Sequence, residues 1–305
     1  MEVIDLADAW KKLVKLVVNE GKSAAPRDLD TIEVENVEIN YLRPSYIFTN
    51  KLRRLNPVFH LVELFYFMDG RNDKLLIEYI SKMKDFQNVG TGRFDGSYGP
   101  ALYECLPCVV QQLRADPLSR RAVFPMLRMQ HVASPHTKDF PCNIVIGLRL
   151  RDKALNMNVV TRSQDLYRGF LYDTLEFQLL QFMLANLFKV NVGKYHHTVF
   201  SLHLYSDDIE KAQRASILPS DVQEEPRLPQ FTTYDELWEF CHIRCAVAEY
   251  AVWNSANPGR VLFNLFNYGL GVDDMSNAIV QYTSRKSDTG NLVGPYTKWV
   301  NKWME

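Results

Sequence analysis

The feature that most constrains this chain is a pair of apolar runs joined by a short charged turn. The runs cover residues 143–150 and 154–161, and residues 151–153 separate them. Two strand-like runs divided by so short a polar segment predict an antiparallel β-hairpin. A hairpin brings its two open ends together, so the residues that flank it become neighbours. In this sequence those residues are Cys142 and Arg162.

A cysteine at the start of a strand is most often a buried apolar side chain. A neighbouring cation favours a different interpretation, because a thiol is a useful nucleophile only as the thiolate, which a guanidinium stabilises. Cys142 follows a proline and precedes the first strand of the hairpin, and Arg162 follows the second strand. The pattern therefore indicates Cys142 as a candidate nucleophile, with core packing as the alternative.

The other four cysteines give weaker signals. Cys105 and Cys108 form one C-x-x-C within a predicted helix, while Cys241 and Cys245 are one helical turn apart in another. A structural zinc ion needs four ligands, and neither pair has a second pair to complete it, so we predict no metal site. Five cysteines, an odd number, favour free thiols and a reducing compartment.

Charge and hydropathy exclude several classes of protein. The 305 residues carry a formal net charge of −1 and no basic stripe, which argues against a nucleic-acid polymer, so any phosphate that the protein binds should belong to a small molecule. The amino-terminal segment has an amphipathic pattern and lacks the features of a signal peptide. No apolar run is long enough to cross a membrane, so we expect a cytoplasmic protein without a membrane partner.

The remaining segments predict helices and antiparallel strands in irregular order. Helices are expected at residues 3–19, 56–70, 71–83, 101–116, 171–187 and 234–254. Strands are expected at 119–129, at 198–205 and, as a pair around a turn, at 31–42. A glycine-rich loop should cover residues 88–100. The order shows no regular βαβ alternation, which favours an α+β fold.

Several polar side chains occupy places where they would serve a binding site. Glu63 interrupts the apolar run of a predicted helix, where a charge is costly to bury unless it is paired or catalytic. Arg120 and Arg121 begin a predicted strand, and two guanidinium groups there would clamp a phosphate. His203 and Tyr205 alternate on one strand face and would hydrogen-bond a sugar. The alternatives are solvated arginines, a structural acid and a histidine satisfied by hydrogen bonds.

Six sequence motifs, taken in order, resemble the thymidylate synthase superfamily. They are ELFYFMDG at 63–70, GSYGPAL at 96–102, DPLSRR at 116–121, PC at 141–142, TRSQDLYRG at 161–169 and SLHLYS at 201–206. Residues 215–260 and the carboxyl-terminal tail match poorly. The resemblance implies one domain over residues 1–305, with a thymidylate synthase-like α+β fold. It also implies a large mixed sheet with surrounding helices and a homodimer formed sheet to sheet.

The resemblance also assigns roles to individual residues. The catalytic set would be Cys142, Glu63, Tyr98 and Asp173. The nucleotide would be bound by Arg162, Ser163, Asp165, Asp173, His203, Tyr205 and, in a looser alignment, Arg27. Arg120 and Arg121 would reach the phosphate in the partner's active site. The co-substrate would be 5,10-methylenetetrahydrofolate, contacted by Phe86, Asp165 and Gly169, with no metal.

Asp173 departs from the uracil-specific synthases, which carry asparagine at this place. A carboxylate accepts a hydrogen bond from the 4-amino group of cytosine, and from N3 once N3 is protonated. Asp173 therefore predicts a cytosine nucleotide, and the chain resembles the deoxycytidylate hydroxymethylases of phages, which would act in a bacterial or phage-infected cytoplasm. The resemblance implies that Cys142 adds to C6 of dCMP, that C5 attacks the folate methylene, and that water completes a 5-hydroxymethyl group.

Three alternatives stay open within this resemblance. One is a dCMP 5-methyltransferase that produces dihydrofolate, although Phe86, where the synthases carry tryptophan, would leave more room for water. Another is a CMP 5-hydroxymethylase. The third is a catalytically inactive nucleotide-binding or RNA-binding homologue, against which the joint presence of Cys142, Arg162, Glu63 and Tyr98 argues. A zinc-dependent deaminase is excluded, since the chain lacks a P-C-x-x-C motif.

Overall fold

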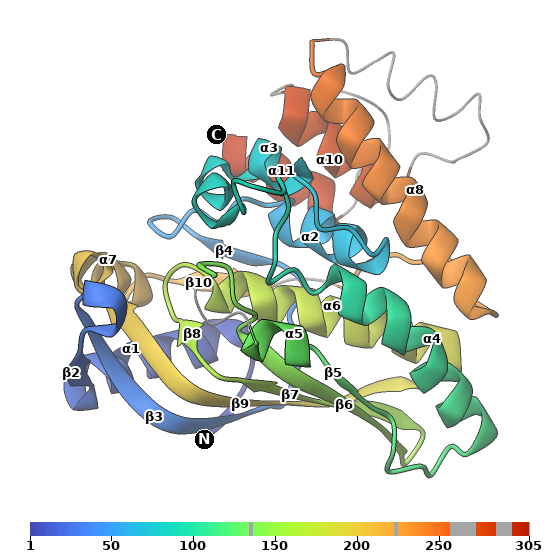
Figure 1. Ribbon diagram of the computed structural model, residues 1–305, viewed down its shortest axis with the longest axis horizontal. Coiled ribbons are helices and arrows are strands. Elements are labelled where there is room, and N and C mark those ends of the chain that lie inside the picture. The colour runs from blue at the N-terminus through green and yellow to red at the C-terminus, as the bar shows by residue number, and fades with distance from the viewer. Residues whose placement is uncertain (134–136, 223–224, 257–272, 285–294, 305) are drawn as a thin grey trace. The chain divides into compact units, whose positions relative to one another are not determined.

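The computed structural model describes residues 1–133, 137–222, 225–256, 273–284 and 295–304 (Figure 1). The backbone forms two compact units, each described here by itself. The first unit comprises the described residues within Met1–Leu55, Cys105–Pro135 and Phe140–Gln223. The second comprises those within Asn56–Glu104, His136–Asp139 and Glu224–Glu305. The single domain over residues 1–305 stays a prediction.

A mixed sheet forms the centre of the first unit, in the order β1-β3-β9-β7-β6-β5, with β2 beside β3 and β8 beside β9. Its strands are β1 (Glu2–Val3), β2 (Lys22–Ala24), β3 (Thr31–Tyr41), β5 (Val123–Pro125), β6 (Asn143–Arg151), β7 (Ala154–Thr161), β8 (Gln164–Asp165) and β9 (Asn191–Tyr205). Strand β9 is antiparallel to β3 and parallel to β7, whereas β6 is antiparallel to both β7 and β5. The predicted α+β class with a large mixed sheet is confirmed.

The predicted hairpin is formed by β6 and β7. Arg151 pairs with Ala154, which leaves Asp152 and Lys153 as the two turn residues. Their φ angles are 51° and 57°. Two successive residues in the left-handed region are typical of a type I′ turn, whose twist matches that of the flanking strands. At the open end, the Arg162 amide donates a hydrogen bond of 2.8 Å to the carbonyl of the residue before β6.

The predicted pair of strands at residues 31–42 is wrong. Residues 31–41 form the one strand β3, which pairs along its length with β9. Asn36, which resembles a turn residue in the sequence, has a φ of 56° inside this strand. A single left-handed residue interrupts the regular pairing without reversing the chain, and asparagine tolerates that conformation better than most residues. Strand β9 also begins seven residues before the predicted 198–205.

The two faces of the sheet differ in burial. His197 of β9 is fully buried, and its ring stacks at 6.0 Å on Phe170 at the start of α6 (Phe170–Phe188). Figure 1 shows α6 lying along this face of the sheet. On the opposite face, Phe200 of β9 is 46% exposed and Val123 of β5 is 42% exposed. The resemblance assigns this second face to a homodimer, which stays a prediction.

Short helices and a second small sheet complete the first unit. They are α1 (Leu6–Glu20), η1 (Pro26–Asp28), α5 (Met129–Val132), α7 (Ser206–Ser216) and the antiparallel strands β4 (Phe48–Asn50) and β10 (Ser220–Val222). Helix α4 (Gly99–Ala115) contributes residues to both units. Helix α1 starts where the Asp5 side chain accepts a hydrogen bond from the Asp8 amide, three residues later than predicted.

The described elements of the second unit are helical. They are α2 (Phe59–Met68), α3 (Leu75–Tyr79), η2 (Ser81–Phe86), α8 (Tyr234–Trp253), α10 (Asp274–Ser284) and α11 (Pro295–Met304). Every residue of α2 is buried, as its continuous apolar run predicts. The side chain of Asn56 accepts a hydrogen bond from the Val58 amide and donates to Tyr79 and Tyr282, which ties the start of α2 to α3 and α10.

No helix in the described part of the chain combines the length and apolar character needed to cross a bilayer.

Trp10 of α1 supports the segment after β8. Its side chain is fully buried, meets Phe48 edge-on at 5.6 Å, and donates from Nε1 to the Leu166 carbonyl at 3.0 Å. We predict that Trp10→Ala lowers the free energy of unfolding by about 3–5 kcal/mol, measured by urea denaturation. The control Trp253→Ala removes a ring that is 77% exposed and should stay within about 0.5 kcal/mol of wild type. Equal effects of the two substitutions would contradict the assignment.

Candidate functional site

Arg162 is the anchor of the segment that carries Cys142. Its Nε donates to the Pro141 carbonyl and its Nη2 to the Phe140 carbonyl, both at 2.9 Å. The guanidinium also lies 4.9 Å from the centroid of the Phe140 ring. Nη2 is 3.9 Å from Cys142 Sγ, so the predicted proximity of the two residues is confirmed. A guanidinium held at this distance favours the anionic form of the thiol.

The buried cysteines of α8 show why a nearby arginine is insufficient by itself to ionise a thiol. Arg71 Nη1 lies 3.7 Å from Cys245 Sγ, yet this guanidinium also pairs with Asp73 at 2.6 Å and with Glu249 at 2.9 Å. Burial raises the pKa of Cys245 to about 12 and that of Cys241 higher still. Both thiols therefore stay protonated. Cys142 differs because it is only half-buried.

Two strands bring Asp165, His203 and Tyr205 together. The parallel pairing of β8 with β9 sets Asp165 opposite His203, whose ring meets Tyr205 edge-on at 5.3 Å. Burial lowers the pKa of His203, so its ring is held neutral near pH 7, although the Asp165 carboxylate opposes this effect. Asp165 Oδ1 accepts the amide hydrogens of Tyr167 and Arg168, each at 2.9 Å, and so fixes the turn that leads into α6.

Arg168 supports this group and was missed in the sequence. Its guanidinium lies 4.4 Å from the centroid of the Tyr205 ring, and its Nε donates to Asp208 Oδ2 at 2.6 Å. The other oxygen of Asp208 accepts a hydrogen bond from Lys211 at 2.7 Å. Through these contacts, Asp208 of α7 holds the Arg168 guanidinium against the Tyr205 ring. An arginine in a loop is usually solvated, so the sequence carries no signal for this role.

Asp173 lies in the first turn of α6 and pairs with a residue of β8. Gln164 is 2% exposed, and its Nε2 donates to Asp173 Oδ2 at 2.6 Å. Burial raises the pKa of Asp173 to about 6, against the effect of this hydrogen bond. Gln164 was also missed in the sequence, although it stands between the candidates Ser163 and Asp165. Ser163 is half-buried, and Gly169 is the N-cap residue of α6.

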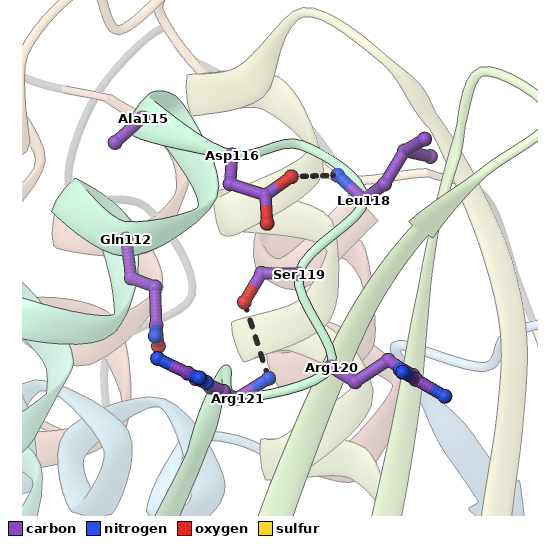
Figure 2. Close-up of a pocket in the computed structure, with 7 residues that line it drawn as sticks. All are labelled: Gln112, Ala115, Asp116, Leu118, Ser119, Arg120 and Arg121. Carbon is purple, nitrogen blue, oxygen red and sulfur yellow. Dashed lines mark hydrogen bonds between the residues drawn. The ribbon is translucent and has the colours of Figure 1, made fainter.

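Arg120 and Arg121 line an open hollow of about 600 Å³ after α4 (Figure 2). The lining residues are Gln112, Ala115, Asp116, Leu118, Ser119, Arg120 and Arg121. The Ser119 hydroxyl accepts the Arg121 amide at 3.1 Å, which shapes the turn. In Figure 2 the Arg121 side chain extends toward Gln112, and the Arg120 side chain points the other way. The two guanidinium groups thus do not converge within one protomer.

The remaining predicted site residues lie on separate elements. Arg27 is exposed in η1, with a φ of 59°. Glu63 is buried in α2, and Tyr98 is buried just before α4 with its ring 5.1 Å from Phe67. Phe86 ends η2 and is 41% exposed. Glu63, Tyr98 and Phe86 belong to the second unit, and their roles beside Cys142 stay predictions.

Comparison with known proteins identifies relatives of this chain. Residues 8–255 match the family model of thymidylate synthase. A protein of Bacillus phage SP01 named deoxyuridylate hydroxymethyltransferase is 30% identical over 218 residues, which cover 65% of this chain and 57% of that protein. A protein of the same name from Pseudomonas phage M6 is 29% identical over 187 residues, covering 58% and 53%. The thymidylate synthase of Streptococcus gordonii is 28% identical over 165 residues, covering 52% and 57%. The chain thus spans little more than half the length of these relatives.

The raised pKa of Asp173 predicts a pH-dependent contribution to stability. The folded state binds this proton more tightly than the unfolded state, so the stabilisation is complete below about pH 4 and is lost as the pH rises through about 6. The asparagine side chain of the variant Asp173→Asn cannot titrate. We expect the unfolding free energy of wild type, relative to Asp173→Asn, to fall by about 3 kcal/mol between about pH 3 and about pH 7, measured by urea denaturation at a series of pH values.

Asp208→Asn is the control of opposite sign for this measurement. Burial acts to raise the pKa of Asp208, but hydrogen bonds from Lys211 and Arg168 outweigh it and lower that pKa. Its stabilisation is therefore present above the unfolded pKa and lost as the pH falls. Parallel stability curves for wild type and Asp173→Asn would contradict the prediction.

Proposed function

Because the chain belongs to the thymidylate synthase family, we propose that it transfers a one-carbon unit to C5 of a pyrimidine nucleotide, and that its reaction is the 5-hydroxymethylation of dCMP. The observation that best supports the proposed one-carbon transfer is the guanidinium of Arg162, fixed 3.9 Å from Cys142 Sγ. The observation that favours cytosine is the carboxylate of Asp173, held by the amide of Gln164.

Cys142 begins the proposed reaction. Its thiolate forms a bond to C6 of the pyrimidine, and the electron pair of the C5–C6 double bond makes C5 nucleophilic. The co-substrate 5,10-methylenetetrahydrofolate supplies the one-carbon unit when bound. Once C5 has bonded to that carbon, loss of the C5 proton would break the bond between the carbon and the folate nitrogen and release tetrahydrofolate. A water molecule would then add to the exocyclic carbon, and the C6–S bond to Cys142 would break to restore the C5–C6 double bond. The products are 5-hydroxymethyl-dCMP and tetrahydrofolate.

The second unit supplies the proposed acid–base groups. Glu63 is buried in an apolar helix, where a carboxyl group is costly to place unless it is paired or catalytic. We assign it to ordering the attacking water, with Tyr98 as a further proton carrier. For the folate, we assign Asp165, Gly169 and Phe86. The exposed ring of Phe86 offers an aromatic surface of the kind that a flat pterin or benzoyl group stacks on.

The first unit supplies the proposed nucleotide site. His203 and Tyr205 would hydrogen-bond the deoxyribose, and the neutral histidine can both donate and accept. Arg162, Ser163 and Arg27 would bind the phosphate. Arg162 can serve two purposes because a guanidinium has five N–H donors.

A homodimer would complete this site. The half-exposed sheet face with Val123 and Phe200 offers an apolar surface for a second copy. Arg120 and Arg121 would then reach the phosphate bound by the partner. Their divergence within one protomer is compatible with this role, since each would approach a phosphate held elsewhere.

Hydroxymethylation of dUMP is the second candidate. The phage relatives named deoxyuridylate hydroxymethyltransferases favour it. A protonated Asp173 also favours it, because a neutral carboxylic acid donates to O4 of uracil and accepts from N3–H, as asparagine does. Formation of 5-methyl-dCMP with dihydrofolate, and hydroxymethylation of CMP, are further alternatives within the same chemistry.

The product decides between these reactions. We predict that dCMP incubated with the protein and methylenetetrahydrofolate gains one CH₂O unit by mass spectrometry, without the absorbance of dihydrofolate. Cys142→Ser should reduce turnover by at least about a thousandfold, because the hydroxyl is a much weaker nucleophile. The control Cys108→Ser changes an exposed thiol of α4 and should retain wild-type turnover. A gain of one CH₂ unit with dihydrofolate would replace hydroxymethylation by methylation.

Base selection has its own test. We predict that Asp173→Asn shifts the ratio of kcat/KM for dCMP and dUMP toward dUMP by about a hundredfold, since asparagine donates where uracil has an acceptor. The two nucleotides are assayed separately and in direct competition. An unchanged ratio would remove Asp173 from base recognition, and a wild-type preference for dUMP would favour the second candidate function.

A further inference from the structure

Gln164 is a buried glutamine of β8 whose side-chain amide is hydrogen-bonded to Asp173 of α6. Its side chain is 2% exposed, and one end of its amide is used to bind Asp173 at 2.6 Å. The other end, Oε1, is buried, and no described residue donates a hydrogen bond to it. A buried acceptor without a donor costs free energy, and such groups are uncommon in folded proteins. The Oε1 of Gln181 is also buried without a donor, so the feature that distinguishes Gln164 is its hydrogen bond to Asp173.

The direction of the Gln164–Asp173 hydrogen bond determines what Asp173 can do. The amide Nε2 is only a donor, so this bond favours the charged carboxylate and occupies Oδ2. Burial acts in the opposite direction and favours the neutral acid. The charged form only accepts hydrogen bonds, as the amino group of cytosine requires. The neutral form also donates, as O4 of uracil requires.

Other titratable groups of the first unit do not replace this donor. The hydroxyl of Tyr195 on β9 is buried and makes no hydrogen bond with any described residue, so it does not act as a donor to Asp173. Glu176 lies one turn further along α6 and is itself fully buried. A second carboxyl group favours neutralisation of Asp173 rather than its charge. The balance therefore depends on the hydrogen bond from Gln164.

We propose that Gln164 is a positioning residue that sets the pyrimidine preference, because it holds the Asp173 carboxylate in the orientation and charge state that cytosine requires. This inference rests on the proposed function and extends it, since it assigns base selection to a residue of β8 as well as to Asp173 of α6. Strand β8 is fixed by its parallel pairing with β9, so the donor approaches from a rigid element.

Gln164→Met tests the proposal, because methionine keeps the approximate volume of glutamine and removes the N–H donor. The readouts are the dissociation constants of dCMP and dUMP, from calorimetric titration, and kcat/KM for both nucleotides. We expect the preference for dCMP over dUMP to fall by about tenfold in both readouts, which corresponds to one hydrogen bond to a charged group. Gln164→Asn, which keeps an amide but is too short to reach Asp173, should show the same shift.

The matched control is Gln181→Met. Gln181 is another fully buried glutamine of the first unit, and its Nε2 donates to the Leu155 carbonyl at 2.7 Å. This substitution should lower stability and leave the base preference at the wild-type value. A double-mutant cycle adds specificity, because in the Asp173→Asn background the change Gln164→Met should have no further effect on the ratio.

The outcomes separate this inference from the proposed function. An unchanged preference in folded Gln164→Met or Gln164→Asn overturns the inference. An equal fall in Gln181→Met also overturns it, because the effect would then be one of general packing. Wild-type protein that binds both nucleotides without turnover contradicts the proposed function alone, since the binding ratio still decides the role of Gln164. Folded wild-type protein that binds neither nucleotide overturns both.

Discussion

The guanidinium of Arg162 joins the two open ends of the β6–β7 hairpin, and the candidate chemistry depends on this contact. It donates to the carbonyls of Phe140 and Pro141 and lies beside Cys142 Sγ. The turn at the other end of the hairpin fixes the register of the two strands through two left-handed residues. A slip of one residue in that register would turn every side chain of a strand to the opposite face. The turn geometry thus determines where the sulfur lies.

Strand β9 performs a similar function for the residues that we propose to bind the nucleotide. It pairs with β3, β7 and β8, so each of its side chains has a defined direction. The pairing with β8 sets Asp165 opposite His203, and the carboxylate of Asp165 then fixes the turn into α6 by accepting two amide hydrogens. Helix α6 begins at Phe170, and Asp173 follows within its first turn. One short segment of the chain therefore carries residues that we propose to bind the sugar, the base and the phosphate, and local hydrogen bonds hold it in place.

Local patterns predicted much of this arrangement, and tertiary contacts account for what they missed. Alternation and turn chemistry were sufficient for the hairpin, and therefore for the approach of Cys142 to Arg162. The same alternation was misleading at Asn36, because a left-handed residue within a strand and a turn residue have the same local signature. Gln164 and Arg168 gave no signal, since their partners, Asp173 of α6 and Asp208 of α7, lie on other elements. A contact between side chains of separate elements has no periodicity in the sequence.

Two ionisable groups of the first unit, Cys142 and Asp173, each depend on one fixed donor for the charged form that the proposed reaction needs. The thiol of Cys142 needs a cation to act as the proposed nucleophile, and the half-buried carboxyl group of Asp173 needs a hydrogen-bond donor to favour its charged form. Water would supply neither effect with a defined direction. Arg162 follows β7 and Gln164 begins β8, and both strands are held by their pairing with β9. The proposed reactivity and base preference therefore both depend on strand register, because the two donors belong to one continuous segment, residues 162–164, immediately after the hairpin.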